Sequence, residues 1–174
     1  MSRRIVLARA VNVGGCTLPM AEWRAIAEAL GAEDVTTYIA SGNLVCTPPE
    51  DHESFDRALE KAVQERFGFF REVVSRSREE AIAALEAHPF EVLEPKHSYV
   101  TFLAGTPTAA AIEKARTFET GDDRWEVIGR ELHIRYAGGA GRPQMKDVSI
   151  GRALAVPGTA RNLNTVRKLV ALAE

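Results

Sequence analysis

The first half of the chain alternates short apolar segments with two helical patterns, and this order limits the folds that it can adopt. Strands are expected at residues 5–11, 35–40, 44–47 and 69–74. Helices are expected at residues 18–30 and 51–67, where apolar side chains recur at helical spacing. The order strand, helix, strand, strand, helix, strand is that of a ferredoxin-like α+β sandwich, also called an α-β plait.

The second half predicts a similar order of elements, although no residue-by-residue repeat is visible. A connecting helix is expected at residues 77–87, with Ser77 and Glu80 as a capping box. The later elements are a strand at 98–104, a helix at 108–118, a hairpin of 125–128 with 132–136, a short helix at 147–154 and a final helix from about residue 159. We therefore expect two tandem ferredoxin-like subdomains, residues 1–76 and residues 77–174, with a C-terminal helix.

Composition is that of a soluble globular protein, with 45% hydrophobic and 26% charged residues in 174. The longest apolar runs fall far short of the roughly 20 residues that a membrane span needs, and the N-terminal residues do not lead into a signal peptide. We expect a cytoplasmic protein without a membrane partner. The two cysteines and four histidines show no metal-ligand spacing, so no metal site is predicted.

Two polar turns follow the first two strands, and the topology predicts that they meet. The first turn carries Arg9, Asn12, Gly14 and Gly15, and the second carries Tyr38, Ser41, Gly42 and Asn43. Because the crossover helix makes the second strand run in the same direction as the first, both turns should lie at one end of the sheet. The first helix begins there too, and its free N–H groups suit an anion.

Each turn also has a purely structural interpretation. Gly14 and Gly15 could serve only a sharp turn, because glycine is favoured where φ is positive. Likewise, Ser41-Gly42-Asn43 is compatible with a tight hairpin turn. Arg9 favours a ligand role, because it is in phase with the apolar strand residues and a partly buried arginine needs a partner. The glycine spacing is neither that of a P-loop nor that of a dinucleotide-binding fold, so no particular cofactor is indicated.

The polar residues Arg161, Asn162, Asn164 and Thr165 crowd the beginning of the final predicted helix. Asparagine is a poor residue inside a helix, and such conflicts with local propensity occur most often at functional sites. One of these residues could instead cap the helix. In residues 130–168, eight basic residues stand against two acidic ones, a local charge of +6. This segment is either a solvated basic face or a surface for anions or nucleic acid.

Four motifs of the chain resemble those of the DUF1697 family of uncharacterised bacterial proteins. The motifs are Arg9-x-x-Asn12-Val13-Gly14-Gly15, Pro19-Met20-Ala21-Glu22-x-Arg24, Thr37-Tyr38-Ile39-x-Ser41-Gly42-Asn43 and Thr159-x-Arg161-Asn162-x-Asn164-Thr165-Val166-x-Lys168-Leu169. The resemblance spans nearly the whole chain and implies two tandem α-β plaits, but no activity. The chain departs from the family pattern at Ala10, at Leu163 and at Gln144-Met145-Lys146.

The sequence thus leads to three hypotheses about function. The first is the binding of a small anionic or phosphate-bearing ligand at the glycine-loop end of the first sheet, with the polar residues 161–165 reaching the same site. The second is a module that binds nucleic acid or protein. The third is an enzyme of unknown reaction, for which only Cys16 near a helix start and the polar clusters argue. Neither a cofactor nor an oligomeric state is indicated.

Overall fold

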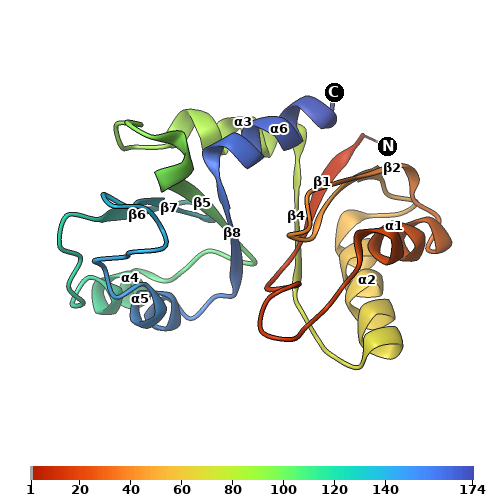
Figure 1. Cartoon of the computed structure of the whole chain (residues 1–174), viewed down its shortest axis with the longest axis horizontal. Coiled ribbons are helices and arrows are strands. Elements are labelled where there is room, and N and C mark those ends of the chain that lie inside the picture. Colours follow the sequence, from red (N-terminus) through yellow and green to blue (C-terminus); the bar gives the residue numbers. More distant parts are fainter. Residues whose placement is uncertain (1) are drawn as a thin grey trace. The chain divides into compact units, whose positions relative to one another are not determined.

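Residues 2–174, which the computed structural model describes, form an α+β fold with two four-stranded antiparallel sheets and six α-helices (Figure 1). The chain divides into two units. The first comprises Met1–Ile82 together with Lys168–Glu174, and the second comprises Ala83–Arg167. The end of the chain belongs to the first unit, where Arg78 donates to the carbonyl of Val170 (3.1 Å) and pairs with Glu174 (3.1 Å).

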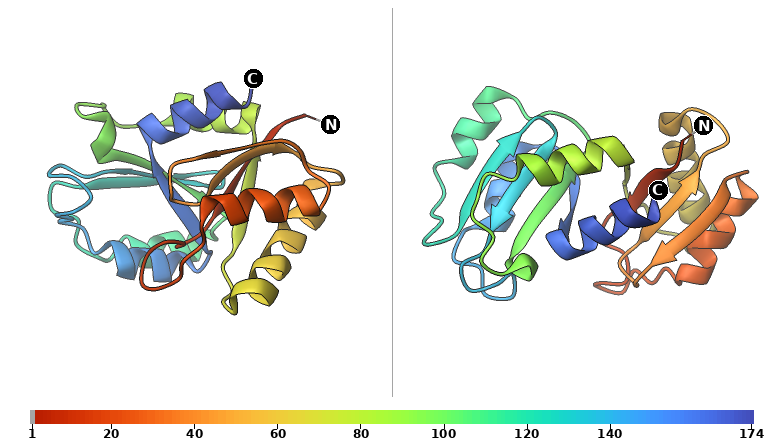
Figure 2. Two further views of the ribbon diagram at one scale, coloured as in Figure 1. Left: turned by 45° about the vertical axis from the view of Figure 1, so that its right-hand side comes forward. Right: turned by 90° about the horizontal axis from the view of Figure 1, so that it is seen from above.

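The first unit contains a sheet in the order β2-β3-β1-β4. Its elements are β1 (Arg4–Ala8), α1 (Met20–Ala29), β2 (Glu33–Tyr38), β3 (Asn43–Thr47), α2 (His52–Phe67) and β4 (Val73–Ser77). Helices α1 and α2 pack on one face of this sheet (Figures 1 and 2). The core between them includes Val6, Trp23, Leu44, Phe55 and Leu59, all of which are buried.

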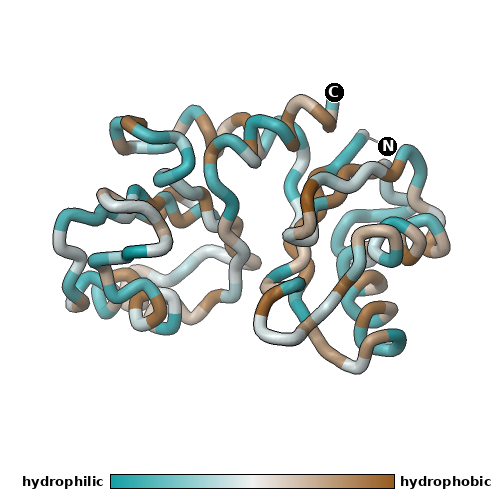
Figure 3. The backbone as a smooth tube through the Cα atoms, viewed as in Figure 1, coloured by the Kyte–Doolittle hydropathy of each residue, from teal (hydrophilic) through white to brown (hydrophobic). Residues whose placement is uncertain are grey.

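The second unit repeats this order of elements, and its sheet has the equivalent strand order β6-β7-β5-β8. Its elements are β5 (Ser98–Leu103), α4 (Ala109–Ala115), β6 (Arg124–Ile128), β7 (Glu131–Arg135), α5 (Asp147–Leu154) and β8 (Gly158–Asn162). Buried side chains of Trp125, Leu132, Ile134, Ile150 and Leu154 form its core. In the tube of Figure 3, hydrophobic and hydrophilic residues alternate along the helices, as expected for helices that pack through one face.

Three further elements complete the chain: α3 (Arg78–Ala87), the short 3₁₀ helix η1 (Pro95–His97) and α6 (Leu163–Leu172). The predicted capping box at the start of α3 is confirmed. The N–H of Ser77 donates to Oε2 of Glu80 (2.8 Å), and the N–H of Glu80 donates to Oγ of Ser77 (3.1 Å). None of the helices in residues 2–174 combines the length and the apolar character that crossing a bilayer requires.

The prediction that residues 159–162 begin the final helix is wrong. These residues belong to β8, which pairs with β5 so that Arg161 lies opposite Val100 and Thr159 opposite Phe102. The strand ends at Asn162 and α6 begins at Leu163. The physical reason lies in β5: without β8, one edge of this strand would have no hydrogen-bonding partner. Strand bounds also differ from those expected: β1 ends at Ala8, β2 ends at Tyr38 and β4 begins only at Val73.

Candidate functional site

The two polar turns of the first unit meet at one end of its sheet, and the side chain of Asn12 joins them. Its Nδ2 donates to the carbonyls of Ala40 (2.5 Å) and Leu18 (2.9 Å), while its Oδ1 accepts from the N–H of Leu18 (2.8 Å). The N–H of Ala8 also donates to the carbonyl of Gly42 (3.0 Å). Asn12 therefore holds the loop of residues 9–17 against the hairpin turn of residues 39–42.

Gly14 and Gly15 are the central residues of a tight turn. The N–H of Cys16 donates to the carbonyl of Val13 (3.2 Å), and both glycines have positive φ, 58° and 86°. These φ values are those of a type I′ turn, so the turn itself requires both glycines. A Cβ atom at either position would have no neighbour within 4 Å. The tip of the loop is therefore open to solvent.

Two arginines lie beside this loop, and only one of them was predicted. Arg9 donates to Glu72 (3.0 Å), so its partner is a carboxylate of the chain itself. Arg71 donates through Nε to the carbonyl of Ala10 (3.3 Å) and through Nη2 to Sγ of Cys16 (2.8 Å). Sequence reasoning missed Arg71 because residues 69–74 were assigned to a strand, whereas Arg71 precedes β4 at the end of the sheet where β1 stops.

The hairpin turn is held by Asn43, which is completely buried. Its Nδ2 donates to the carbonyl of Tyr38 (3.0 Å) and to Oγ of Ser41 (2.9 Å). Gly42 has a φ of 86°, and a Cβ atom there would lie 2.8 Å from Cγ2 of Val11. Asn43 and Gly42 thus have structural roles, whereas Ser41 in the turn and Tyr38 at the end of β2 are both half-buried.

The polar residues at positions 161–165 belong to the second unit. Oδ1 of Asn162 accepts from the N–H of Thr165 (2.9 Å), which caps the first turn of α6 and explains one of the two asparagines. Arg161 is 7% exposed and donates to the hydroxyl of Thr159 and the carbonyl of Ala160. Burial lowers the pKa of Arg161 to about 10. Asn164 is exposed.

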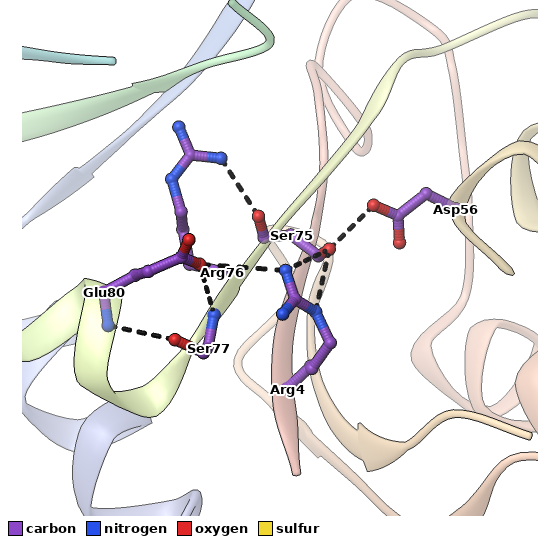
Figure 4. A network of polar contacts seen from close by, with 6 residues as sticks. All are labelled: Arg4, Asp56, Ser75, Arg76, Ser77 and Glu80. Carbon is purple, nitrogen blue, oxygen red and sulfur yellow. Dashed lines mark hydrogen bonds and ion pairs between the residues drawn. The ribbon is translucent and has the colours of Figure 1, made fainter. Parts of the chain in front are cut away.

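A buried polar network in the first unit was not predicted (Figure 4). Oγ of Ser75 donates to Oδ2 of Asp56 (2.7 Å) and accepts from Nη2 of Arg4 (3.2 Å), which lies 3.8 Å from Glu80. Asp56 is 5% exposed, and burial raises the pKa of its carboxyl to about 6. The sequence carried a signal for this, because Asp56 adjoins the apolar stripe of α2 that contains Phe55 and Leu59.

The glycine-rich segment of residues 138–143 is a loop, and a buried aspartate holds it. Asp123 accepts hydrogen bonds from the N–H groups of Ala137 (2.8 Å), Gln144 (2.6 Å) and Met145 (3.0 Å). Its exposed fraction is 0%. Its role is to satisfy backbone donors at both ends of this loop.

The second unit also contains a pair of histidines in contact. Nδ1 of His88 lies 3.0 Å from Nδ1 of His133, so one ring donates to the other. His133 is buried, and burial together with the neighbouring His88 lowers its pKa to about 4. The pKa of His88 is lowered by burial and by Arg167. Within residues 2–174, no group of three or more His, Cys, Asp and Glu side chains is arranged to hold a metal ion.

A solved structure of similar fold is that of the conserved bacterial protein SP0830 from Streptococcus pneumoniae. The two sequences are 24% identical, the alignment covers 99% of each chain, and the TM-score is 0.74. This likeness concerns the fold alone. No curated protein matches the chain at a significant level. The model of DUF1697, whose description is "protein of unknown function", matches residues 1–133 and confirms the resemblance seen in the three motifs that lie in this range. The chain therefore belongs to the DUF1697 family.

Proposed function

We propose that the chain binds a small anion, such as a phosphate group, at the end of the first sheet where the loop of residues 9–17 meets the turn of residues 39–42. One observation carries this proposal. Among residues 2–174, the N–H groups of Gly14 and Gly15 donate no hydrogen bond, and they lie in an exposed turn next to Arg71. Free backbone N–H groups beside a guanidinium are a common way to bind an anion.

The charges around the loop support this proposal through Arg71 rather than Arg9. The charge of Arg9 is balanced by Glu72. Arg71 donates to carbonyls and to a sulfur atom, and it forms no ion pair within the part of the chain that the structure describes. An unbalanced guanidinium has donors for a phosphate or carboxylate oxygen. We therefore assign the main charge contact to Arg71 and a weaker one to Arg9.

The remaining residues of the first unit's site would shape it rather than bind. The side chains of Asn12 and Asn43 are engaged in bonds that hold the two turns together. Tyr38 and Ser41 lie at the hairpin, where the Oγ of Ser41 accepts a hydrogen bond from Asn43. This division of roles places most of the binding energy in the backbone N–H groups and the arginines.

The same proposal includes a ferredoxin-like arrangement for each unit. Both units have the order strand, helix, strand, strand, helix, strand, and in both sheets the first and third of these strands are central. That combination supports an α-β plait, in which loops at the sheet ends are free to vary.

A titration with inorganic phosphate, followed by amide NMR of the full chain, tests the proposed site. We expect saturable shifts at residues 13–16, and Arg71→Gln should weaken binding about tenfold because a charge-assisted hydrogen bond is lost. Arg24→Gln is the matched control, since Arg24 is an exposed arginine on α1. Absence of shifts at residues 13–16, or equal affinity of Arg71→Gln and the parent chain, would overturn the proposal.

A further inference from the structure

The second unit contains a cavity of about 310 Å³ that none of the predicted site residues lines. It lies at the end of the sheet where β5 begins and β7 ends. The residues that matter for its chemistry are Leu93, Glu94, His97, Ser98, Arg135 and Tyr136. Its volume is at the lower end of the range for small-molecule sites, which starts at about 300 Å³.

Arg135 is the guanidinium of this cavity, and most of its donors have no partner within residues 2–174. Its one hydrogen bond runs from Nη2 to the carbonyl of Asp122, at the long distance of 3.3 Å. Within residues 2–174 it forms no ion pair, and its side chain is half-buried. A guanidinium carries five N–H donors and binds carboxylates through two parallel bonds. The cavity therefore offers a carboxylate a preformed partner.

Apart from Glu94, the other walls are aromatic, apolar or neutral. Tyr136 is 8% exposed, and its ring packs edge-on against Tyr99 with centroids 5.6 Å apart. Leu93 is 76% exposed, so an apolar ligand body would cover a side chain that otherwise faces water.

His97 is fixed beside these walls by its neighbours. Its carbonyl accepts from the N–H of Tyr136 (2.9 Å), and its ring lies against Gly139, where a Cβ atom would be 3.1 Å from Nε2. Gly139 has a φ of 91°, so a side chain there would be strained as well as crowded. The glycine loop can thus approach His97 closely and hold one side of the cavity in place.

Glu94 restricts the charge of the ligand. It lines the same cavity as Arg135, and the two form no ion pair. A doubly charged phosphate would meet repulsion from Glu94, whereas a single carboxylate bound to Arg135 would meet less. We propose that this cavity binds a small organic acid with one carboxylate, held by Arg135, and an apolar body that packs on Tyr136 and Leu93.

The equivalent place in the first unit shows why the second unit is the better candidate. A cavity of about 260 Å³ lies where β1 begins and β3 ends, and it too is lined by an arginine and a histidine, Arg4 and His52. There, however, Arg4 donates to Ser75 through Nε and Nη2 and lies 3.8 Å from Glu80. The arginine of the first cavity is already engaged by a hydroxyl and lies near a carboxylate, whereas Arg135 makes one long hydrogen bond to a carbonyl.

An amide NMR titration of the full chain with benzoate, phenylacetate and hexanoate tests this site. We expect saturable shifts at residues 93–98 and 135–137. Benzamide, which has the shape of benzoate without its charge, and inorganic phosphate should each bind these residues at least about tenfold more weakly. These residues differ from residues 13–16, so failure of this site and failure of the phosphate site are separate results.

Variants of Arg135 test whether its guanidinium binds the carboxylate of the ligand. Arg135→Gln should weaken benzoate binding about tenfold or more, and Arg135→Lys, which keeps the charge but loses the two parallel bonds, should be intermediate. The control is Arg142→Gln, an exposed arginine in the neighbouring loop. Any one of three results would overturn the proposal: no saturable shift with the three acids, benzamide binding as tightly as benzoate, or unchanged benzoate affinity in Arg135→Gln. The benzamide comparison uses the parent chain, so it does not depend on the folding of a variant.

Discussion

The two units share one order of elements but differ in where they carry their long loop. In the first unit the long connection follows the first strand, and in the second it follows the third strand, after β7. The first and third strands of each unit are antiparallel. The long loop therefore lies at one end of the sheet in the first unit and at the non-equivalent end of the sheet in the second unit. The candidate sites differ accordingly. The long loop, and with it the proposed binding site, thus lies at a different end of the sheet in each unit.

The side chains that hold the two loops also differ in burial. Asn12 holds the loop of the first unit through bonds that are partly open to solvent, whereas Asp123 is completely buried and accepts three backbone N–H groups. A buried donor that loses its acceptor costs more free energy than an exposed one. The loop of the second unit should therefore depend more strongly on its single side chain.

The chain has two tryptophans, and each reports on one unit: Trp23 is in the core of the first unit and Trp125 in that of the second. Trp23→Phe and Trp125→Phe backgrounds therefore separate the two unfolding signals.

The largest expected effect is that of Asp123→Ala. The variant leaves three backbone N–H groups without their acceptor, so the free energy of unfolding of the second unit should fall by roughly 3–5 kcal/mol. Denaturant unfolding followed by Trp125 in the Trp23→Phe background measures it. Asp122→Ala is the control, since Asp122 is exposed and should change stability by no more than about 0.5 kcal/mol. Equal losses in both variants would contradict the role of Asp123.

Several features of the first unit followed from the sequence because they depend on neighbouring residues or on topology. Helix α2 has Asp51 as its N-cap and Gly68 at its end with a φ of 78°, and both residues are recognisable without a structure. The meeting of the two polar turns followed from the direction of the strands alone. Local sequence signals and the direction of the strands were sufficient to predict these features of the first unit.

Other features depend on contacts between distant residues and gave no local signal. Strand β8 is short and polar, and it is a strand only because β5 offers it an edge. Arg71 reaches the glycine loop, and Arg135 shares a cavity with His97, across many residues of sequence. No periodicity or spacing records such contacts, which is why the sequence located one candidate site and missed the other.

The second prediction concerns pH in the second unit. The pKa of His133 is lowered from 6.5 to about 4, so its neutral form is favoured in the folded state. The stability that this contributes is present above pH 6.5 and lost as the pH falls toward 4, by about 3 kcal/mol. Unfolding followed by Trp125 should show this fall, and His133→Gln should reduce it. His52→Gln, which changes an exposed histidine, should leave it unchanged.

The first unit should respond to pH in the opposite sense. The pKa of Asp56 is raised from 3.8 to about 6, so its protonated form is favoured in the folded state. The corresponding stability is present below pH 3.8 and lost as the pH rises through 6, by about 3 kcal/mol, slightly less than for His133 because the shift is smaller. Asp56→Asn should remove this dependence, as followed by Trp23 in the Trp125→Phe background. The control is Glu53→Gln on the same helix. The same pH trend in both units would break the contrast between them.

The smallest expected effect is that of Asn12→Ala, which should lower the free energy of unfolding of the first unit by about 1–2 kcal/mol. The loss is small because the hydrogen bonds of Asn12 are partly exposed. Asn12 also has a φ of 58°, a conformation that asparagine tolerates better than alanine. Asn12→Gly separates these causes, since glycine accepts this φ but makes no side-chain bonds. A loss in Asn12→Gly close to that in Asn12→Ala would assign the effect to the hydrogen bonds. A loss as large as that of Asp123→Ala would show that burial does not set the difference between the two loops.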